Sequence, residues 1–254
     1  MVLRIQAQAR ENSTTFQTYK QGNELLAEYG LDSVDCPICN NTGVVQYMKD
    51  GFMYSKECRC MAARRYNRRI ERSGIADMIG RYTFANYQTP DKLRQSIKAD
   101  AQKFCEADRG WWYISGRPGS GKTHICVAMC NRFAEMGKNI RYMLWRDDST
   151  ELKGMLNQPE YKERIEPLKT VQVLYIDDFL KAGKKEGKQK ITEADINLAF
   201  ELLNSRYNNS KLRTIISSEL AVKDILEIDE ATGSRIWECS FKHRAPEENW
   251  RLRG

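Results

Sequence analysis

The most specific chemical pattern in the chain is a glycine-rich loop that ends in lysine and threonine. Residues 116–123, GRPGSGKT, match GxxxxGK[ST] at every defined position, after an apolar run and before a helical one. Such glycines let backbone N–H groups and the positive end of a helix converge on phosphate. Lys122 is expected to reach the β- and γ-phosphates and the Thr123 hydroxyl a Mg²⁺ ion. A chance glycine-rich turn is the alternative, but the flanking segments favour a nucleotide site.

Two adjacent carboxylates follow another apolar run, VLYI, further along the chain. A strand would carry Asp177 to the carboxyl edge of a sheet, beside the phosphate loop, where it can hold Mg²⁺ through water. Asp178 is then placed to polarise the attacking water. A strand followed by an ordinary acidic turn explains this motif alone. Together, the two motifs favour a site that hydrolyses a nucleoside triphosphate.

A third pattern is a set of paired cysteines. Cys36 and Cys39 form a CxxC pair, and Cys58 and Cys60 form a CxC pair eighteen residues later. Closely spaced thiolates in a reducing compartment fit tetrahedral Zn²⁺, and a closed set of four ligands indicates a structural role. Simple buried cysteines are the alternative, but turns and charged residues flank these four. Cys126 and Cys130 instead recur one turn apart on an apolar helix and are expected to be core residues.

Composition limits the class of protein. The chain has 254 residues, 41% hydrophobic and 30% charged, which suits a core domain with an appendage. No stretch approaches the unbroken apolar length of a membrane span, and the N-terminus MVLRIQAQARENST lacks a secretory apolar block. We therefore expect a cytoplasmic protein with no membrane partner, whose cysteines are not disulfides.

Positive charge gathers in two places within a net charge of +7. Residues 56–72 hold seven basic side chains against two acidic ones, with arginines at helical spacing. A second patch, expected to contact nucleic acid, comprises Lys181, Lys184, Lys185, Lys188 and Lys190. Either patch alone can equally be a solvated face.

Apolar strands alternate with helices after residue 75, which is typical of a parallel α/β sheet. The expected strands are 111–115, 139–145, 171–176 and 213–217. The expected helices are 13–29, 61–73, 91–106, 122–136, a broken stretch within 148–169, and 192–207. We predict an N-terminal zinc-binding domain over 1–75 and, over 76–254, an α/β P-loop core with a five-stranded parallel sheet between helices.

Several segments together resemble one family, the DnaC/DnaI-type replicative helicase loaders, which are AAA+ ATPases related to IstB transposition helpers. The resemblance rests on SGRPGSGKTH, VLYIDDF, RYTFANY, TIISSEL, GSRIWE and NWRLR, with CPIC and CRC near the N-terminus. It implies an AAA+ ATPase that binds ATP and Mg²⁺ in the core and Zn²⁺ in the N-terminal region.

The resemblance also implies roles for individual residues. Nucleotide contacts are expected from Gly116, Arg117, Pro118, Gly119, Ser120, Gly121, Lys122, Thr123, His124, Tyr82, Phe84, Ser218 and Arg251. The expected catalytic residues are Lys122, Asp177, Asp178 and Arg235, the last acting on a neighbouring subunit's nucleotide. The family usually has a Ser/Thr-Asn pair where this chain has Ser218-Glu219, and an ionised carboxylate cannot donate a hydrogen bond to phosphate. That departure predicts slow hydrolysis.

The preferred interpretation is an ATP-dependent loader that grips a hexameric replicative helicase through its zinc domain. It would self-associate through its AAA+ domain on single-stranded DNA. One alternative is a transposition helper that binds duplex DNA and a transposase. Another is a non-hydrolysing ATP-binding adaptor or inhibitor of a helicase, which Glu219 motivates. A zinc module with a vestigial P-loop is disfavoured because both nucleotide motifs are intact.

Overall fold

The computed structural model describes residues 36–252 apart from 182–183, 186–187 and 190. The segment 13–29, which the sequence predicts to be helical, lies outside the described residues. The chain divides into two compact units, the first ending at Arg68 and the second beginning at Arg69. The helix α3, Cys60–Ser73, crosses that division. The domain boundary at 75/76 stays a prediction.

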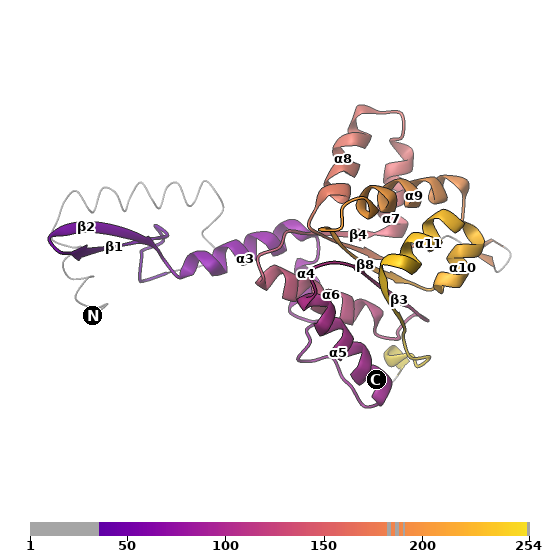
Figure 1. Cartoon of the computed structure of the whole chain (residues 1–254), viewed down its shortest axis with the longest axis horizontal. Coiled ribbons are helices and arrows are strands. Elements are labelled where there is room, and N and C mark those ends of the chain that lie inside the picture. Colours follow the sequence, from indigo (N-terminus) through magenta and orange to yellow (C-terminus); the bar gives the residue numbers. More distant parts are fainter. Residues whose placement is uncertain (1–35, 182–183, 186–187, 190, 253–254) are drawn as a thin grey trace. The chain divides into compact units, whose positions relative to one another are not determined.

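The first unit is built on an antiparallel hairpin of β1, Val44–Lys49, and β2, Phe52–Glu57 (Figure 1). Its two-residue turn is Asp50-Gly51, with φ values of 51° and 82°. Both central residues of a type I′ turn need positive φ, and Asp-Gly is among the pairs that adopt it readily. The hairpin therefore lies between the two cysteine pairs and brings them together.

The second unit contains a five-stranded parallel sheet with the order β4-β5-β8-β3-β9. The strands are β3, Trp111–Ser115; β4, Ile140–Leu144; β5, Val173–Asp177; β8, Arg213–Ser218; and β9, Ser240–Arg244. Every residue of β3, β5 and β8 is buried, as in a parallel sheet covered on both faces. The predicted fold class is confirmed.

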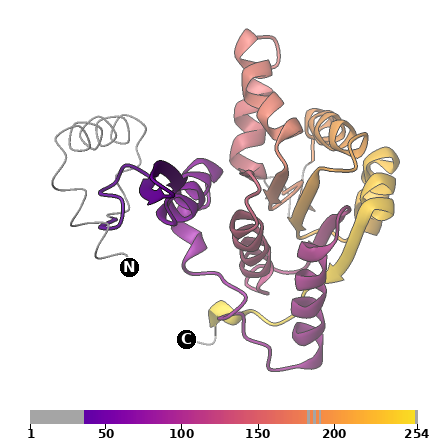
Figure 2. The ribbon, with the colours of Figure 1, turned by 60° about the vertical axis from the view of Figure 1, so that its left-hand side comes forward.

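Helices cover both faces of this sheet (Figure 2). They are α4, Ala76–Ile79; α5, Lys92–Glu106; α6, Lys122–Glu135; α7, Trp145–Gly154; α8, Pro159–Thr170; α9, Glu193–Tyr207; α10, Val222–Ile228; and α11, Glu230–Cys239. Alternation along β3 divides the core. Trp112 packs on Phe104 of α5, whereas Trp111 and Tyr113 join the cluster formed by α7 to α11.

Most expected elements form within a residue or two of their predicted ends, because their signals are local. Thr192 and Asp195 make a capping box at the start of α9, and Gly137 has a φ of 85° just after α6. The hairpin, β9, α10 and α11 were not expected from the sequence. Cys126 and Cys130 are fully buried, as expected of core residues. No helix in the described ranges is long and apolar enough to cross a membrane.

Candidate nucleotide and metal sites

The glycine-rich loop joins the carboxyl end of β3 to the start of α6. Gly119 and Gly121 have φ values of 78° and 92°, which glycine adopts readily and other residues rarely do. A Cβ atom on Gly119 would overlap the amide group of Asn249. The Lys122 ammonium donates to the carbonyls of Gly116 (2.7 Å) and Arg117 (2.9 Å), so it curls under the loop. The backbone is thus closely wrapped, as phosphate binding requires.

The residues of this loop fit a bound phosphate. The Ser120 hydroxyl is buried and has no hydrogen-bond partner among the described residues. Burial lowers the pKa of the Lys122 ammonium, an effect that the nearby carboxylates of Asp178, Glu219 and Asp177 oppose. A buried cation and a buried donor at the start of a helix form an anion-binding arrangement.

Asp177, at the end of β5, is the centre of a hydrogen-bond network that reaches three other elements. Its carboxylate accepts from Thr123 of α6 and Tyr142 of β4, each at 3.4 Å, and from the Ser217 hydroxyl of β8. The structure therefore brings Thr123 and Asp177 together, the two predicted Mg²⁺ ligands. Carboxylate and hydroxyl oxygens are ligands that Mg²⁺ prefers, so this pair fits the ion.

Asp178, the second predicted carboxylate, lies next to this network but pairs with a different group. Its Oδ2 is 3.0 Å from the Lys181 ammonium, which is also 2.8 Å from Oε1 of Glu219. The three side chains are all partly buried. Lys181, predicted to contact nucleic acid, is therefore paired with two carboxylates of its own chain.

A cavity of about 200 Å³ opens beside the loop. Its lining residues are Asn86, Tyr87, Gln88, Arg94, Ser120, Gly121, His124 and Trp250. His124 contacts the Thr83 carbonyl (3.0 Å) and the Asn86 side chain (2.9 Å) through Nε2. Tyr82, predicted to lie near the base, packs against the His124 ring at 5.1 Å but does not line the cavity. Phe84 is half-buried and does not line it either.

The C-terminal segment closes over the same loop. The Trp250 backbone N–H donates to the Gly119 carbonyl at 3.0 Å, and the Arg94 guanidinium lies 4.8 Å from the Trp250 ring centroid. Arg117 pairs with Glu247 at 3.0 Å, and Pro118 is exposed. Arg251 belongs to a short 3₁₀ turn, η1, Trp250–Leu252. The segment predicted to carry a phosphate-sensing arginine thus borders the nucleotide cavity.

Two other predicted residues make contacts within the chain. The Ser218 hydroxyl is fully buried and donates to the Phe179 carbonyl at 2.8 Å. Arg235 of α11 donates to Asn204 (3.1 Å) and to the Ala231 carbonyl (2.6 Å). Its guanidinium also lies over the rings of Phe200 and Tyr207, at 4.9 and 5.3 Å. Among the described residues it forms no ion pair, so no carboxylate there neutralises its charge.

Three of the remaining predicted lysines, Lys184, Lys185 and Lys188, lie in a short β-ribbon of β6, Lys184–Lys185, and β7, Lys188–Gln189, which pair antiparallel. Lys190 lies outside the described residues. The ribbon follows the carboxylate motif directly, so it starts at the same edge of the sheet as the nucleotide site.

The four paired cysteines converge in the first unit. All are buried, and their sulfur atoms lie within 4.8 Å of one another. The Sγ atoms of Cys36 and Cys58 are 3.7 Å apart, and those of Cys39 and Cys60 are 3.6 Å apart. Tetrahedral zinc with Zn–S bonds of ~2.3 Å separates its sulfurs by roughly 3.8 Å. The cluster therefore fits Zn²⁺ in size, ligand type and number.

Its surroundings also fit a metal. Burial raises the pKa of the Cys39 thiol to about 12 and raises that of Cys60, so thiolates at these two positions need a compensating cation. At Cys36 burial also acts to raise the pKa, but hydrogen bonds from the backbone N–H groups of Cys39 and Ile38 outweigh it and lower the pKa to about 7. Arg64, almost fully buried, donates to the Asn41 side chain at 2.7 Å, and Asn41 also accepts from the Cys36 backbone N–H at 2.8 Å. Arg64 is therefore tied to the cluster through Asn41, whereas the sequence pattern only counts it among the seven basic residues of 56–72.

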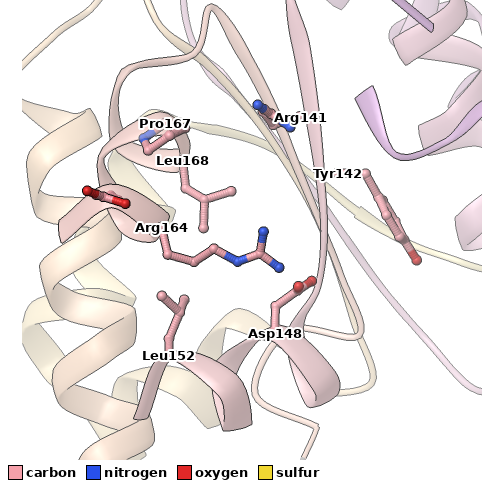
Figure 3. A pocket seen from close by; sticks show the side chains of 8 residues that line it. Arg141, Tyr142, Asp148, Leu152, Arg164, Pro167 and Leu168 are labelled. Carbon is pink, nitrogen blue, oxygen red and sulfur yellow. The ribbon is translucent and has the colours of Figure 1, made fainter. Parts of the chain in front are cut away.

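A second cavity, about 210 Å³ in volume, lies among β4, α7 and α8 (Figure 3). Arg164 extends toward Asp148 across it, and Tyr142 borders it. None of the residues predicted for the nucleotide site lines this cavity. Its opposite charges compensate one another, so it shows no preference for an anion.

Several site residues were not predicted, and their sequence signals differ. Ser217 precedes the serine that was chosen, and only strand alternation shows which of the two faces Asp177. Asn86 and Tyr87 lie within the quoted RYTFANY motif and Trp250 within NWRLR, so those motifs did mark the cavity. Tyr142 had no signal, because its contact with Asp177 depends on strand order.

A phosphate loop on β3, carboxylates on β5 and a parallel sheet of this strand order define an AAA+ type nucleotide-binding fold. Residues 52–228 match the family model described as IstB-like ATP binding protein. The chain belongs to this family of ATP-binding proteins, and the resemblance found in the sequence is confirmed.

Individual relatives extend this result. The chain is 31% identical to the phage-like element PBSX protein XkdC of Bacillus subtilis (strain 168), over 90% of both chains. It is 29% identical to the uncharacterized protein YqaM of the same strain, over 91% of this chain and 87% of that one. Against the replicative helicase loader DnaC of Escherichia coli (strain K12) it is 26% identical, over 46% of this chain and 50% of DnaC.

Solved structures share the fold. A crystal structure of DnaI superposes with a TM-score of 0.54 at 19% identity, covering 67% of this chain and 91% of that one. A crystal structure of the DnaC helicase loader gives a TM-score of 0.56 at 19% identity, covering 66% and 98%. At such identities these matches establish the architecture alone.

Proposed function

We propose that this protein is an ATP-dependent loader of a hexameric replicative DNA helicase onto single-stranded DNA. The observation that carries the proposal is the convergence of Lys122, Thr123, Asp177 and Asp178 at one sheet edge, in a chain that also has a four-cysteine unit. The similarity to the replicative helicase loader DnaC of Escherichia coli also supports this function.

In this proposal the loop residues Gly116 to Thr123 hold the phosphates of ATP. Thr123 and Asp177 hold Mg²⁺, which neutralises charge on the β- and γ-phosphates when bound. Asp178 orients and polarises the attacking water, and the cavity beside Tyr87 and Trp250 receives the base. ATP binding favours assembly, and hydrolysis releases it.

Assembly would complete the site from a neighbouring copy. Arg235 extends its guanidinium to the γ-phosphate bound by the next subunit, where a fixed fork of donors matches the developing charge. Its lack of a carboxylate partner among the described residues supports that role. Arg251 would contact phosphate within its own subunit.

Besides ATP, the protein in this proposal binds single-stranded DNA. Lys184, Lys185, Lys188 and Lys190 contact its backbone, since the ribbon that carries most of them starts beside the nucleotide site. The zinc-binding domain, predicted over residues 1–75, grips the helicase. Zn²⁺ on Cys36, Cys39, Cys58 and Cys60 keeps that domain folded.

A reconstituted loading assay tests the proposal. The protein is mixed with the replicative helicase of its own host and a single-stranded DNA circle carrying an annealed oligonucleotide, and displacement of that oligonucleotide is measured. We expect ATP-dependent displacement with the wild-type protein and none with Lys122→Ala. Displacement that is equally fast without the protein would overturn the proposal.

Two other functions predict different results in the same assay. The family match to IstB-like proteins favours a transposition helper, which would bind duplex DNA and a transposase and leave helicase loading unchanged. Glu219 favours a non-hydrolysing adaptor or inhibitor, which would bind ATP, show no turnover with DNA, and lower helicase activity. Measuring ATP turnover and duplex binding in parallel separates the three.

A further inference from the structure

The chain carries a carboxylate where an amide donor is expected beside the γ-phosphate. Glu219 follows directly after β8, at the sheet edge that also holds Asp177 and Asp178. Placed alone at this edge, an ionised Glu219 would repel a phosphate and could donate no hydrogen bond to it. Either this position plays no part in nucleotide chemistry, or another group converts it into a favourable one.

Lys181 is that other group. Its ammonium lies 2.8 Å from Glu219 and 3.0 Å from Asp178, and it joins the residue after β8 to the residue after β5. Although burial lowers the pKa of Lys181, its hydrogen bonds to Glu219 and Asp178 outweigh burial and raise it, so the group stays charged. An ammonium has three N–H donors, and among the described residues these two carboxylates use two of them.

The local backbone is shaped to place this side chain. Asp178 and Leu180 have φ values of 54° and 55°, a conformation that non-glycine residues rarely adopt. The Lys181 N–H donates to the Asp178 carbonyl at 2.9 Å, and the resulting turn carries the lysine side chain back over Asp178. Unfavourable dihedrals persist where the surrounding structure enforces them, often at functional sites.

The charge of this ammonium also acts on the lysine of the phosphate loop. The charges of Asp178, Glu219, Asp177 and Lys181 all act on the pKa of Lys122, and Lys181 is the cation among them. Lys122 itself lies under the loop, bonded to the Gly116 and Arg117 carbonyls. The two ion-pair partners of Lys181, Asp178 and Glu219, follow β5 and β8 at the sheet edge that carries Asp177.

We infer that Lys181 is a catalytic residue that donates its third hydrogen bond to the γ-phosphate of ATP, with Glu219 as its anchor. The Lys181–Glu219 pair then supplies the donor that an asparagine supplies in relatives with Ser/Thr-Asn at this position. The same ammonium also holds Asp178, the carboxylate that polarises water in our proposal. Binding of the γ-phosphate to Lys181 would therefore fix the position of Asp178 as well. This inference rests on the proposed ATP-hydrolysing function.

The alternative is that Lys181 forms a purely structural ion pair. The two roles predict different changes in ATP and ADP affinity when the lysine is removed. A γ-phosphate contact affects ATP and leaves ADP alone, whereas a structural pair affects both or neither. They also differ in rescue, because an amide at position 219 can replace a lost phosphate donor but cannot replace a lost ion pair to Asp178.

Titration calorimetry with ATPγS and with ADP in Mg²⁺ separates the two roles. Lys181→Ala should weaken ATPγS binding about tenfold or more, as for a lost hydrogen bond to a charged group, and change ADP binding less than twofold. Lys181→Arg should keep most of the affinity. Lys211→Ala, an exposed lysine beyond the other end of β8, is the matched control and should change neither.

The double variant Lys181→Ala/Glu219→Asn completes the test. It should recover ATPγS affinity and single-turnover hydrolysis to within about threefold of wild type, while Lys181→Ala alone hydrolyses about 100-fold slower. Equal losses for ATPγS and ADP, unchanged ATPγS affinity in Lys181→Ala, or a double variant as defective as the single one would each overturn the inference. Absence of wild-type hydrolysis would refute the proposed ATPase function, and the ATPγS–ADP comparison would still decide the role of Lys181.

Discussion

The two units of the chain are stabilised in opposite ways. In the first, the buried cluster consists of the four cysteines, and the partly buried Ile38, Val45 and Met61 pack against it. Every residue of β2 is exposed. In the second, three strands are buried along their whole length and large apolar side chains from five helices cover one face. In our proposal bound zinc stabilises the first unit, whereas apolar packing stabilises the second.

This difference has a functional consequence. If zinc holds the four cysteines, the surface of the first unit can change while the ligands stay fixed. The exposed side chains of this unit include Met48, Phe52 and Met53. A nucleotide site needs several strands held in register, since Thr123, Tyr142 and Ser217 reach Asp177 from three elements. The comparison predicts that a change in one unit impairs that unit and leaves the structure and activity of the other unchanged.

Removing zinc should have the largest effect, and only on the first unit. Wild type should contain about one zinc per chain, and Cys36→Ser/Cys39→Ser should contain none. The hairpin should then unfold, because structural zinc contributes ~10–16 kcal/mol in small zinc-finger peptides. Metal analysis combined with hydrogen exchange checks this, with loss of amide protection expected in β1 and β2 and unchanged protection in β3.

Cys239→Ser is the matched control, since it removes a cysteine of the second unit that lies outside the cluster. It should keep full zinc content. Wild-type protein without zinc, or a Cys36→Ser/Cys39→Ser protein with full zinc content, would show that the cysteines are ordinary core residues.

The second largest effect should come from Arg235, which in our proposal acts on the nucleotide of a neighbouring copy. Arg235→Ala should lower DNA-stimulated ATP turnover about 1,000-fold, the lower end of the range for arginine fingers. A mixture of Arg235→Ala and Lys122→Ala proteins should regain part of the activity, because some interfaces then pair an intact loop with an intact arginine. Steady-state ATPase assays over a range of mixing ratios measure this.

Arg132→Ala, which removes an exposed arginine of α6 paired with Glu106, should leave turnover unchanged. If Arg235→Ala alone hydrolyses ATP at the wild-type rate with single-stranded DNA present, the contact with a neighbour is wrong. Arg244 and Arg251 would then be the arginines to test.

Within the nucleotide site, Lys122 and Asp178 should separate binding from chemistry. Lys122→Ala should weaken ATP binding by about 100-fold, because the ammonium contacts phosphate before the reaction. Asp178→Asn should bind ATP with near wild-type affinity and hydrolyse it about 100-fold slower. Neither change should alter zinc content. If the Asp178→Asn protein hydrolysed ATP at the wild-type rate, Asp178 would not be a catalytic residue.

The lysine ribbon should have the smallest effect, visible mainly in salt dependence. Replacing Lys184, Lys185 and Lys188 with alanine should reduce the slope of log affinity for single-stranded DNA against log salt by about 2, since three phosphate contacts are lost. Fluorescence anisotropy at several salt concentrations measures the slope. An unchanged slope would mean that the ribbon is a solvated surface.

Predictability from the sequence also differs between the units. In the second unit, apolar runs gave four of the five sheet strands, whereas β9, SFKHR, was missed because it is mostly polar and exposed at the sheet edge. In the first, cysteine spacing marked the cluster, but the hairpin was missed although Asp50-Gly51 is a strong turn signal.

Site residues that come from motifs could be predicted, and those that depend on neighbouring strands could not. Lys122, Thr123 and Asp177 follow from spacing alone. The assignment of Lys181 to a basic patch followed its neighbours in sequence, whereas its ammonium lies between Asp178 and Glu219 because β5 and β8 are adjacent in the sheet. Such contacts require knowledge of strand order and of the turn after β5.

The most direct test of the two-unit account is a loading assay with one variant from each unit. Helicase retained on single-stranded DNA circles is measured together with helicase binding in solution and ATP turnover. Both Cys36→Ser/Cys39→Ser and Lys122→Ala should fail to load. The cysteine variant should lose helicase binding and keep its ATP turnover, whereas Lys122→Ala should keep helicase binding and lose turnover. Normal loading by the cysteine variant, or loss of both properties in both variants, would contradict the account.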